Sequence, residues 1–269
     1  MGLSARRYCV RHGIPFTTAF HTRFPEYVHA RFGVPVSWSY AVLRWFHRPS
    51  ASVMVATETV ARELAARGFT NIKSWGRGVD TDLFRPRGDL IKGMSRPVML
   101  YVGRIAVEKN IESFLRLDLQ GTKLVVGDGP QLPELRNRYP NAVFVGAKEG
   151  EDLVAHYSAA DVFVFPSLTD TFGLVLLEAL ACGVPIACFP VAGPIDIVGT
   201  APVGCLDYDL AAAIRGALIM SRDDCRRYAE SFSWAASARQ FLENVQPLEH
   251  GRTANPRRWL RPPKIAPAS

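Results

Sequence analysis

Two carboxylates, Asp170 and Glu178, are the only acidic side chains in residues 169–186, whose residue types predict a polar turn, an apolar helix and a buried strand. Apolar side chains already give this helix a face that can pack on a core, so Glu178 is not needed for packing. A carboxylate among apolar side chains requires a hydroxyl or a cation as its partner. The two acids therefore indicate a site for a polar ligand. The alternative is a solvated helix position and an ordinary turn acid.

The start of this helix is expected to bind phosphate. Thr171 is the predicted N-cap, and Phe172, Gly173 and Leu174 are predicted to form the first turn. The N–H groups of a first turn have no acceptors within the helix and carry the positive end of its dipole. A phosphate group can therefore bind at this end of the helix.

A buried strand before the turn indicates where the two acids lie. Residues 161–166, DVFVFP, are typical of a parallel strand that is covered on both faces. The turn that holds Asp170 would then follow the carboxyl end of this strand, the edge at which open α/β sheets bind ligands.

The strand, the turn, the Phe172–Gly173 pair and the two acids eight positions apart resemble the signature of family 4 glycosyltransferases. The resemblance implies the GT-B fold, a retaining reaction and a nucleotide-sugar donor. In that family the first acid, usually Glu, contacts the sugar hydroxyls, and the second holds the nucleotide ribose. These roles pass by resemblance to Asp170, which is one methylene shorter, and to Glu178.

Two cations, Arg104 and Lys109, follow a predicted buried strand at residues 97–103. A guanidinium fork and an ammonium group just past a strand can clamp a pyrophosphate, whereas surface charge partly offset by Glu108 is the alternative. The family's GR-x4-K pattern matches these residues, so the resemblance implies that they bind the donor diphosphate.

A glycine turn and a short strand complete the predicted donor site. A strand at residues 123–127 leads into GDGP, where Gly127 would let the backbone approach a ligand closely. The edge of the next strand, with Phe144 and Val145, is expected near the nucleotide base. Neither half of the chain contains the GxGxxG fingerprint of a dinucleotide-binding dehydrogenase.

His21 follows a predicted strand at residues 14–20. A lone histidine is more often structural, but a place past the carboxyl end of a strand favours contact with a ligand. In the family that the sequence resembles, a histidine after this strand points into the cleft between the domains, near the transferred sugar. The resemblance implies that His21 and Asp170 are the catalytic residues.

Strands alternate with helices in both halves, which predicts an α/β protein with two Rossmann-like domains that face each other across a cleft, as in GT-B. Residues 76–86 resemble the family's hinge segment. Because the resemblance begins inside the family's first domain, that domain is expected to be truncated, with exposed sheet edges. The predicted parts are a partial acceptor-side domain (1–86), a nucleotide-sugar-binding domain (97–232), a closing helix that returns to the first domain (233–246) and a disordered basic tail (250–269).

Composition limits the class of protein. The 269 residues are 48% hydrophobic and 21% charged, which is typical of a soluble globular protein. No apolar run of membrane-spanning length and no signal peptide is present, and five scattered cysteines form no CxxC, so reduced thiols and a cytoplasmic location are expected. No pattern of a nucleic-acid-binding module is present.

The net charge of +7 comes from basic residues at the two ends of the chain. Residues 37–47, SWSYAVLRWFH, interleave aromatic and cationic side chains, a combination that suits the headgroup level of an anionic membrane. A helix packed in the domain core with a charged outer edge fits the same residues equally well. The first of these two interpretations predicts peripheral contact with the inner face of the plasma membrane.

The sequence thus predicts transfer of a hexose from a UDP- or GDP-linked sugar to a membrane lipid or a cell-envelope glycan. No DxD-type pair of acids is placed for a metal, so no metal cofactor is expected, and cations with a helix end would take its place. The alternative is a truncated or degenerate transferase that binds a nucleotide sugar or a partner without efficient catalysis.

Overall fold

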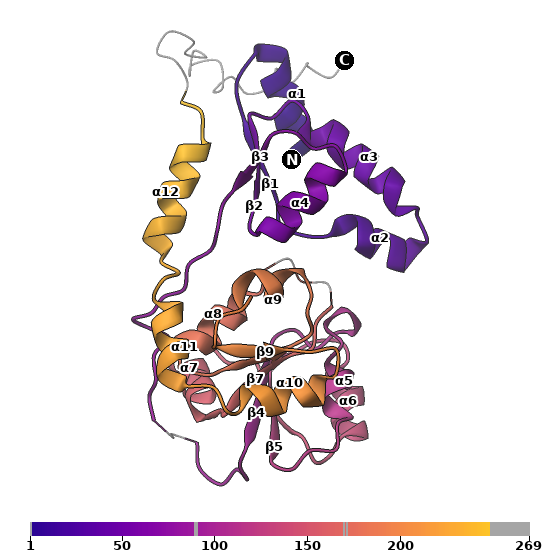
Figure 1. The fold of residues 1–269 in the computed structure, drawn as a ribbon. Helices are drawn as coiled ribbons and strands as arrows, with labels where there is room; N and C mark the ends of the chain where they lie inside the picture. The colour runs from indigo at the N-terminus through magenta and orange to yellow at the C-terminus, as the bar shows by residue number, and fades with distance from the viewer. Residues whose placement is uncertain (1, 89–90, 169, 171, 248–269) are drawn as a thin grey trace, which may run out of the picture.

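The computed structural model describes residues 2–88, 91–168, 170 and 172–247. The predicted N-cap Thr171 and the predicted tail at 250–269 lie outside these residues. The described chain forms two parallel β-sheets with their helices, one above the other (Figure 1). None of the helices in the described ranges is long and apolar enough to cross a membrane.

The first domain has a three-stranded sheet of order β1-β2-β3 in which both neighbouring pairs are parallel. Its core contains Phe20, Tyr40, Val53 and Leu64, contributed by strands and by the helices beside them. Its elements are α1 (Gly2–His12), β1 (Thr17–Phe20), α2 (Phe24–Phe32), α3 (Val36–His47), β2 (Ser52–Val55), α4 (Glu58–Ala66) and β3 (Ile72–Ser74).

The second domain has a six-stranded parallel sheet of order β6-β5-β4-β7-β8-β9. Its strands are β4 (Val98–Val102), β5 (Thr122–Val126), β6 (Val143–Gly146), β7 (Val162–Phe165), β8 (Ile186–Cys188) and β9 (Gly204–Leu206). Its helices are η1 (Val107–Lys109), α5 (Ile111–Leu115), α6 (Leu132–Arg138), α7 (Gly150–Ala159), α8 (Leu174–Ala181), α9 (Ala192–Ile197), α10 (Leu210–Ala217) and α11 (Arg222–Ala229).

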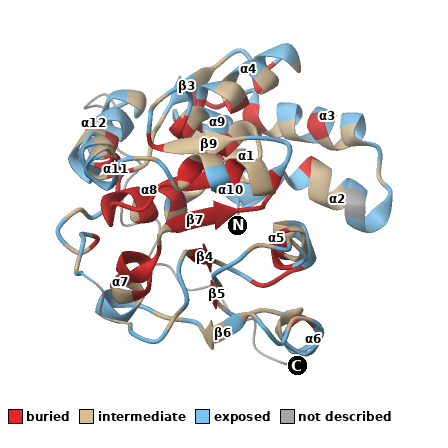
Figure 2. Ribbon diagram, turned by 60° about the horizontal axis from the view of Figure 1, so that its bottom comes forward, coloured by how far each residue is buried: buried red, intermediate tan, exposed pale blue. Residues whose placement is uncertain are grey.

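Burial on both faces explains the apolar strands of this sheet (Figure 2). Along β4, Leu100 and Val102 belong to one core cluster, and Met99 and Tyr101 belong to the other. Such alternation is expected for a strand with helices packed on both sides. The strand order reverses between β4 and β7, so a crevice opens at the carboxyl ends of these two strands.

The helix after the Asp170 turn begins later than predicted. Its N-cap is Gly173, in a left-handed conformation with φ 90°, and its first residue is Leu174. A positive φ cannot continue an α-helix, so Phe172 and Gly173 precede the helix, and the predicted first turn of Phe172, Gly173 and Leu174 is wrong.

The last helix, α12 (Trp234–Asn244), leaves the second domain and lies along the first (Figure 1). Its Asn244 side chain donates to Ser74 O at 2.8 Å, and Ser52 Oγ donates to Asn244 O at 3.1 Å. Gly78 of the hinge segment packs against the start of α12, where a Cβ would lie 2.3 Å from Trp234 N. The two domains are therefore joined by two adjacent chain segments.

A second contact between the domains lies across the cleft. The carboxylate of Asp196 on α9 accepts hydrogen bonds from Thr59 N at 3.1 Å and from Thr59 Oγ1 at 3.0 Å. Asp196 thus satisfies a free N–H in the first turn of α4 from the other domain.

Candidate functional site

A cavity of about 390 Å³ lies at the carboxyl ends of β4 and β7 and is closed on its other side by the first domain and the hinge segment. It is the crevice that the reversal of strand order creates. The sequence-predicted residues that line it are His21, Arg104, Lys109, Asp170, Phe172, Gly173 and Leu174. Side chains that are far apart in the sequence therefore meet at one site.

Lys109 and Asp170 form an ion pair within this cavity. Lys109 Nζ lies 2.6 Å from Asp170 Oδ1, and both side chains are mostly buried. The other carboxylate oxygen, Asp170 Oδ2, is buried and has no hydrogen-bond partner among the described residues, and the same holds for Ser167 Oγ nearby. Buried oxygens without partners are unfavourable, so the site lacks polar groups that a hydroxylated ligand can supply.

Arg104 is the exposed cation of the cavity. It follows β4, and its backbone carbonyl accepts a hydrogen bond from Tyr101 Oη at 2.8 Å, which holds the turn in place. Burial raises the pKa of Tyr101, with the Asp170 and Glu108 carboxylates as further causes, so this hydroxyl remains a donor. No ion pair engages the Arg104 guanidinium within the described part of the chain, which leaves it available to an anion.

His21 enters the cavity from the carboxyl end of β1 and contacts Arg77. Arg77 Nη2 lies 2.8 Å from His21 Nδ1 and 3.4 Å from Nε2. A guanidinium can only donate hydrogen bonds, so the ring nitrogen that accepts from it is unprotonated. Burial lowers the pKa of His21, and the charge of Arg77 lowers it further. The ring is therefore neutral near pH 7.

Arg77 is a cavity residue that the sequence did not identify. It lies between Gly76 and Gly78 in the hinge segment, and its guanidinium carbon lies 4.1 Å from the centroid of the Trp75 ring. A cation flanked by two glycines, where the chain passes between two domains, is the only signal in the sequence that could have indicated it.

Glu178 lies on α8 but does not line this cavity. Its Oε2 accepts a hydrogen bond from Tyr157 Oη at 2.8 Å. Burial raises the pKa of Glu178, and the Tyr157 hydrogen bond opposes that rise. Glu178 is therefore not a freely solvated helix position.

Gly127, Phe144 and Val145 also lie outside the cavity. A Cβ on Gly127, whose φ is 145°, would lie 1.9 Å from Gly103 O, so glycine is required where the turns after β4 and β5 meet. Phe144 packs on the core cluster that contains Met99 and Tyr101, and Arg136 lies over its ring. Val145 packs on the other cluster. Gly127 follows β5, which lies beside β4, and Phe144 and Val145 are on β6, one strand further out on the side away from β7.

Leu174, at the start of α8, faces the cavity and not the core. Its side chain is 42% exposed, whereas Leu176 and Leu177 are fully buried. Gly173, beside it, has little room for a side chain, since a Cβ would lie 3.2 Å from Phe165 and from Leu176. The backbone at the start of α8 is therefore accessible from the cavity.

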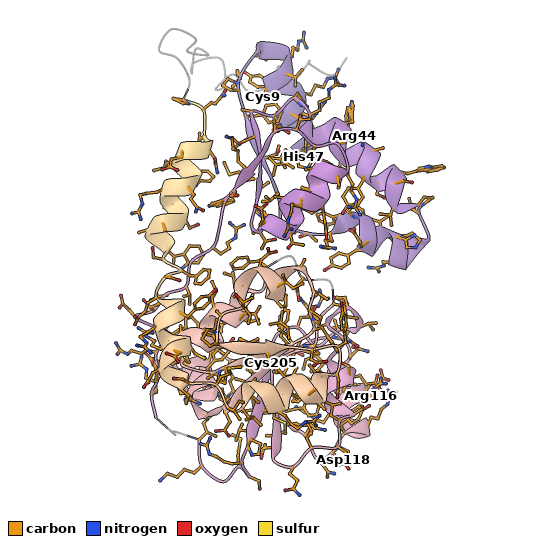
Figure 3. The ribbon with its side chains drawn as sticks, viewed as in Figure 1. Cys9, Arg44, His47, Arg116, Asp118 and Cys205 are labelled. Carbon is orange, nitrogen blue, oxygen red and sulfur yellow. The ribbon has the colours of Figure 1, made fainter. Side chains whose placement is uncertain are left out.

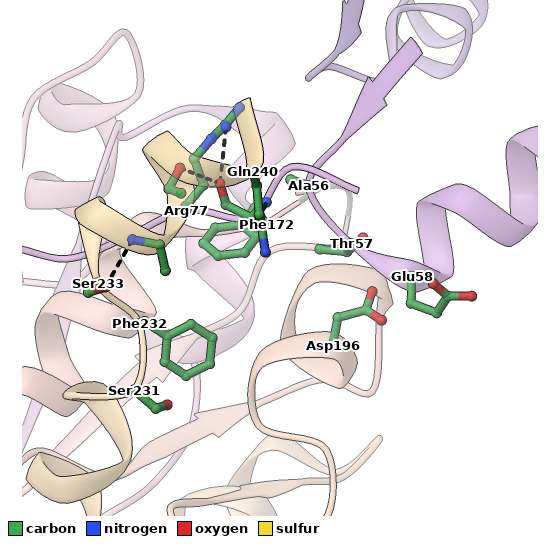
Figure 4. A pocket seen from close by; sticks show the side chains of 13 residues that line it. Ala56, Thr57, Glu58, Arg77, Phe172, Asp196, Ser231, Phe232, Ser233 and Gln240 are labelled. Atoms are coloured by element: carbon green, nitrogen blue, oxygen red, sulfur yellow. Dashed lines mark hydrogen bonds between the residues drawn. The ribbon is translucent and has the colours of Figure 1, made fainter. Parts of the chain in front are cut away.

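A second cavity of about 330 Å³ adjoins the first (Figure 4). Ala56, Arg77 and Phe172 line both cavities, so these residues form the boundary between them. The second cavity is otherwise lined by the start of α4, the hinge segment, α9 and α12. Of the two acidic residues in its lining, Glu58 has an exposed carboxylate that pairs with Arg62, and Asp196 binds Thr59.

Metal-binding side chains are not clustered in the described residues, which contain no group of three or more His, Cys, Asp or Glu that could hold an ion. All five cysteines are free, and Cys9 and Cys205 lie in different domains (Figure 3).

Two Rossmann-like sheets over an interdomain cavity define the GT-B architecture, and solved structures confirm this class of fold. Sucrose-phosphate synthase from Thermosynechococcus elongatus aligns with a TM-score of 0.73 and 25% identity over 84% of this chain and 66% of its own. Anabaena HepE in complex with UDP and glucose aligns with a TM-score of 0.72 and 17% identity over 92% of this chain and 75% of its own.

The family follows from sequence similarity. The model of glycosyl transferases group 1 matches residues 96–220, and the model of glycosyltransferase family 4 matches residues 1–83. The chain belongs to the group 1, family 4 glycosyltransferases, enzymes that use nucleotide sugars, as the sequence predicted.

Curated relatives include mannosyltransferases. The GDP-mannose-dependent alpha-mannosyltransferase of Mycolicibacterium smegmatis is 32% identical over 92% of this chain and 67% of its own length. The protein of that name in Mycobacterium tuberculosis is 29% identical over 94% of this chain and 71% of its own. Sulfoquinovosyl transferase SQD2 of Arabidopsis thaliana is 32% identical over 69% of this chain, which spans 40% of that protein.

Proposed function

We propose that this chain transfers a hexose, with retention of configuration, from a UDP- or GDP-linked sugar to a membrane lipid or cell-envelope glycan. The observation that carries the proposal is the cavity at the carboxyl ends of β4 and β7, where cations, a carboxylate, a histidine and the start of α8 meet. The names of the mannosyltransferase relatives favour GDP-mannose as the donor.

The leaving diphosphate gains charge as the sugar departs, so cations on its oxygens stabilise the transition state. Arg104 has no competing ion pair in the described chain and is suited to this role. Lys109 contributes a second positive charge, and the free N–H groups at the start of α8 contribute the positive end of a helix dipole. These groups supply the charge that a metal ion supplies in other transferases, so we propose that the reaction needs no metal cofactor.

The sugar would lie between Asp170 and His21. Asp170 Oδ2, which has no partner among the described residues, can accept a hydrogen bond from a sugar hydroxyl. The neutral ring of His21 contacts the sugar from the first domain and orients it. Glu178, Gly127, Phe144 and Val145 lie outside the cavity, and their proposed roles, Glu178 at the nucleotide ribose and the other three near the base, are supported by the resemblance to the family.

The test is a transfer assay with GDP-mannose and UDP-glucose, with lipid extracts as acceptors and EDTA present. Transfer that persists in EDTA and is abolished in Glu178→Ala supports the proposal, and NMR of the anomeric proton of the product gives the stereochemistry. Arg85→Ala is the control, because Arg85 is exposed and its side chain does not line the cavity. Binding of a nucleotide sugar without turnover would favour the non-catalytic alternative, and inversion at the anomeric carbon would contradict retention.

An exposed face of α3 supports membrane contact at the cytoplasmic surface. Trp38 and Trp45 are 69% and 55% exposed on one side of the helix, with Val42 between them, whereas Tyr40 on the other side is buried. Arg44, on the same helix, lies on the first domain away from the second (Figure 3). Aromatic side chains beside cations suit an anionic lipid surface.

Vesicle flotation tests this contact. We expect the protein to float with vesicles that contain phosphatidylglycerol but not with phosphatidylcholine alone, and we expect Trp45→Ser to weaken flotation. Equal flotation with both kinds of vesicle would contradict an electrostatic contact.

A further inference from the structure

Arg77 is placed where both cavities of the cleft can be reached. Its side chain lines the cavity of about 390 Å³ and the adjoining cavity of about 330 Å³, and Figure 4 shows it beside Phe172 and Gln240. It belongs to the hinge segment and to neither sheet. A substrate held between the two domains would therefore pass close to this guanidinium.

The charge of Arg77 is not balanced by an acid. The side chain is half-buried, and burial lowers its pKa. No carboxylate lies within ion-pair distance of it in the ranges that the structure describes, whereas Arg23 pairs with Glu63 at 2.8 Å in the first domain. A partly desolvated cation without an anion is unfavourable, and a bound anion would remove that cost.

The guanidinium is also held in place before any ligand binds. It stacks on Trp75 at 4.1 Å, and the Trp75 ring packs against Phe241 of α12 with 5.1 Å between the ring centroids. One amino group faces His21, and the other lies 3.4 Å from Gly76 O. The remaining N–H groups of the fork have no acceptor among the residues that the structure describes, and little side-chain freedom would be lost when a ligand binds.

The charges around Arg77 indicate from which cavity an anion would approach. The larger cavity contains Arg77, Arg104 and Lys109 and a single carboxylate, Asp170, so its lining is positive. The smaller cavity is lined by Arg77 and by the Asp196 carboxylate, which lowers the positive charge of its lining, and its other acidic residue, Glu58, pairs with Arg62 at 4.0 Å. An anion therefore meets Arg77 from the side of Arg104 and Lys109.

We propose that Arg77 binds a phosphoryl group of a substrate in the larger cavity, as a third cation supplied by the hinge segment. The inference rests on the proposed transferase function. A guanidinium fork matches two phosphoryl oxygens at once, which a hydroxyl or a single ammonium group does not. The phosphoryl group belongs either to the donor diphosphate or to a phosphorylated acceptor, and the two sources can be separated by experiment.

The test is calorimetry on the full chain with GDP and UDP, and then with orthophosphate added to GDP-saturated protein. The variants are Arg77→Ala, Arg77→Lys and the exposed control Arg85→Ala, with thermal melting to establish that each variant is folded. If the phosphoryl group is on the donor, Arg77→Ala weakens nucleotide binding by about 10- to 100-fold, and Arg77→Lys restores part of the loss. If it is on the acceptor, nucleotide binding is unchanged and orthophosphate binding to the GDP complex is lost.

Two other outcomes overturn the inference, for different reasons. Wild-type binding of nucleotide with Arg77→Ala equal to Arg85→Ala in every titration would exclude Arg77 and leave the transferase proposal intact. Failure of the wild-type protein to bind either nucleotide would overturn the transferase proposal, and the inference with it.

Discussion

The cleft has one wall formed by the second domain and an opposite wall formed by the first domain and the hinge segment. On the second-domain wall Lys109 pairs with Asp170 at 2.6 Å, whereas on the opposite wall Arg77 faces the neutral ring of His21. On the second-domain wall Lys109 is balanced by Asp170, whereas Arg104 has no ion pair in the described chain, and the opposite wall leaves Arg77 without an acid there. A donor that binds Lys109 must therefore compete with an ion pair that already exists. An anion that reaches the hinge has no such competitor, so the two walls should respond differently to loss of a cation.

The largest effect is expected for Lys109→Ala. Loss of this cation removes charge from the diphosphate site and leaves the Asp170 carboxylate buried without a partner, so the rate of transfer should fall by about 10²- to 10³-fold. Initial rates at saturating donor measure this. Lys148→Ala is the matched control, because Lys148 pairs with Asp152 at 3.0 Å on the exterior of α7. Equal rates in the two variants would show that Lys109 does not stabilise the departing diphosphate.

A smaller effect is expected for Tyr157→Phe, which removes a hydrogen bond from Glu178. Burial already holds the pKa of Glu178 above its ordinary 4.5, and loss of this bond moves the pKa further up. Glu178 is then protonated over a wider range, so the acid limb of the donor-binding profile should move to higher pH. On this acid limb donor affinity should fall by about tenfold.

Calorimetry with GDP-mannose across the pH range measures the profile of Tyr157→Phe. Tyr228→Phe is the control, because that hydroxyl donates to Ile197 O at 2.6 Å and has no contact with Glu178. A profile that coincides in the two variants would show that the ionised form of Glu178 does not bind the donor.

On the opposite wall, Arg77→Ala should raise the pKa of His21. Burial is the larger cause of the lowered pKa and remains in the variant, so the pKa should rise only part of the way towards 6.5. A lowered folded-state pKa penalises the charged ring, so stability is lost as pH falls through the ordinary value towards the folded one. In Arg77→Ala the loss of folding stability at acid pH should be smaller. NMR titration of the His21 ring protons measures the change, and Arg85→Ala, as control, should titrate like wild type.

Much of the second domain follows from its sequence because its strands are continuous apolar runs. The strands at residues 97–103, 123–127 and 161–166 were predicted to within two residues at each end, since burial on both faces leaves a clear pattern. Four elements were not predicted. Helix α5 has five residues, and η1 and β9 have three each, too few for a period to appear, whereas α6 is rich in charged residues.

The site was predictable in its parts but not in its pairings. Positions past the ends of strands indicated His21, Arg104 and Asp170, and the resemblance to a family supported them. Nothing in the sequence indicates that Lys109 reaches Asp170, since 61 positions separate them. The start of α8 was mispredicted because glycine adopts positive and negative φ about equally readily, so the sequence does not show that Gly173 is left-handed.

The smallest effect is expected where the two walls touch. Asp196→Ala removes the carboxylate that accepts from Thr59 N and Oγ1, so α4 loses a cap provided by the other domain. The free energy of unfolding should fall by about 1 kcal/mol. Denaturant titration measures this against Asp118→Ala, whose exposed carboxylate lies at the end of the second domain away from the first (Figure 3). Because Asp196 also lines the smaller cavity and not the larger, donor affinity should stay unchanged. A large loss of donor affinity would mean that closure of the cleft, and not the charge of each wall, controls binding.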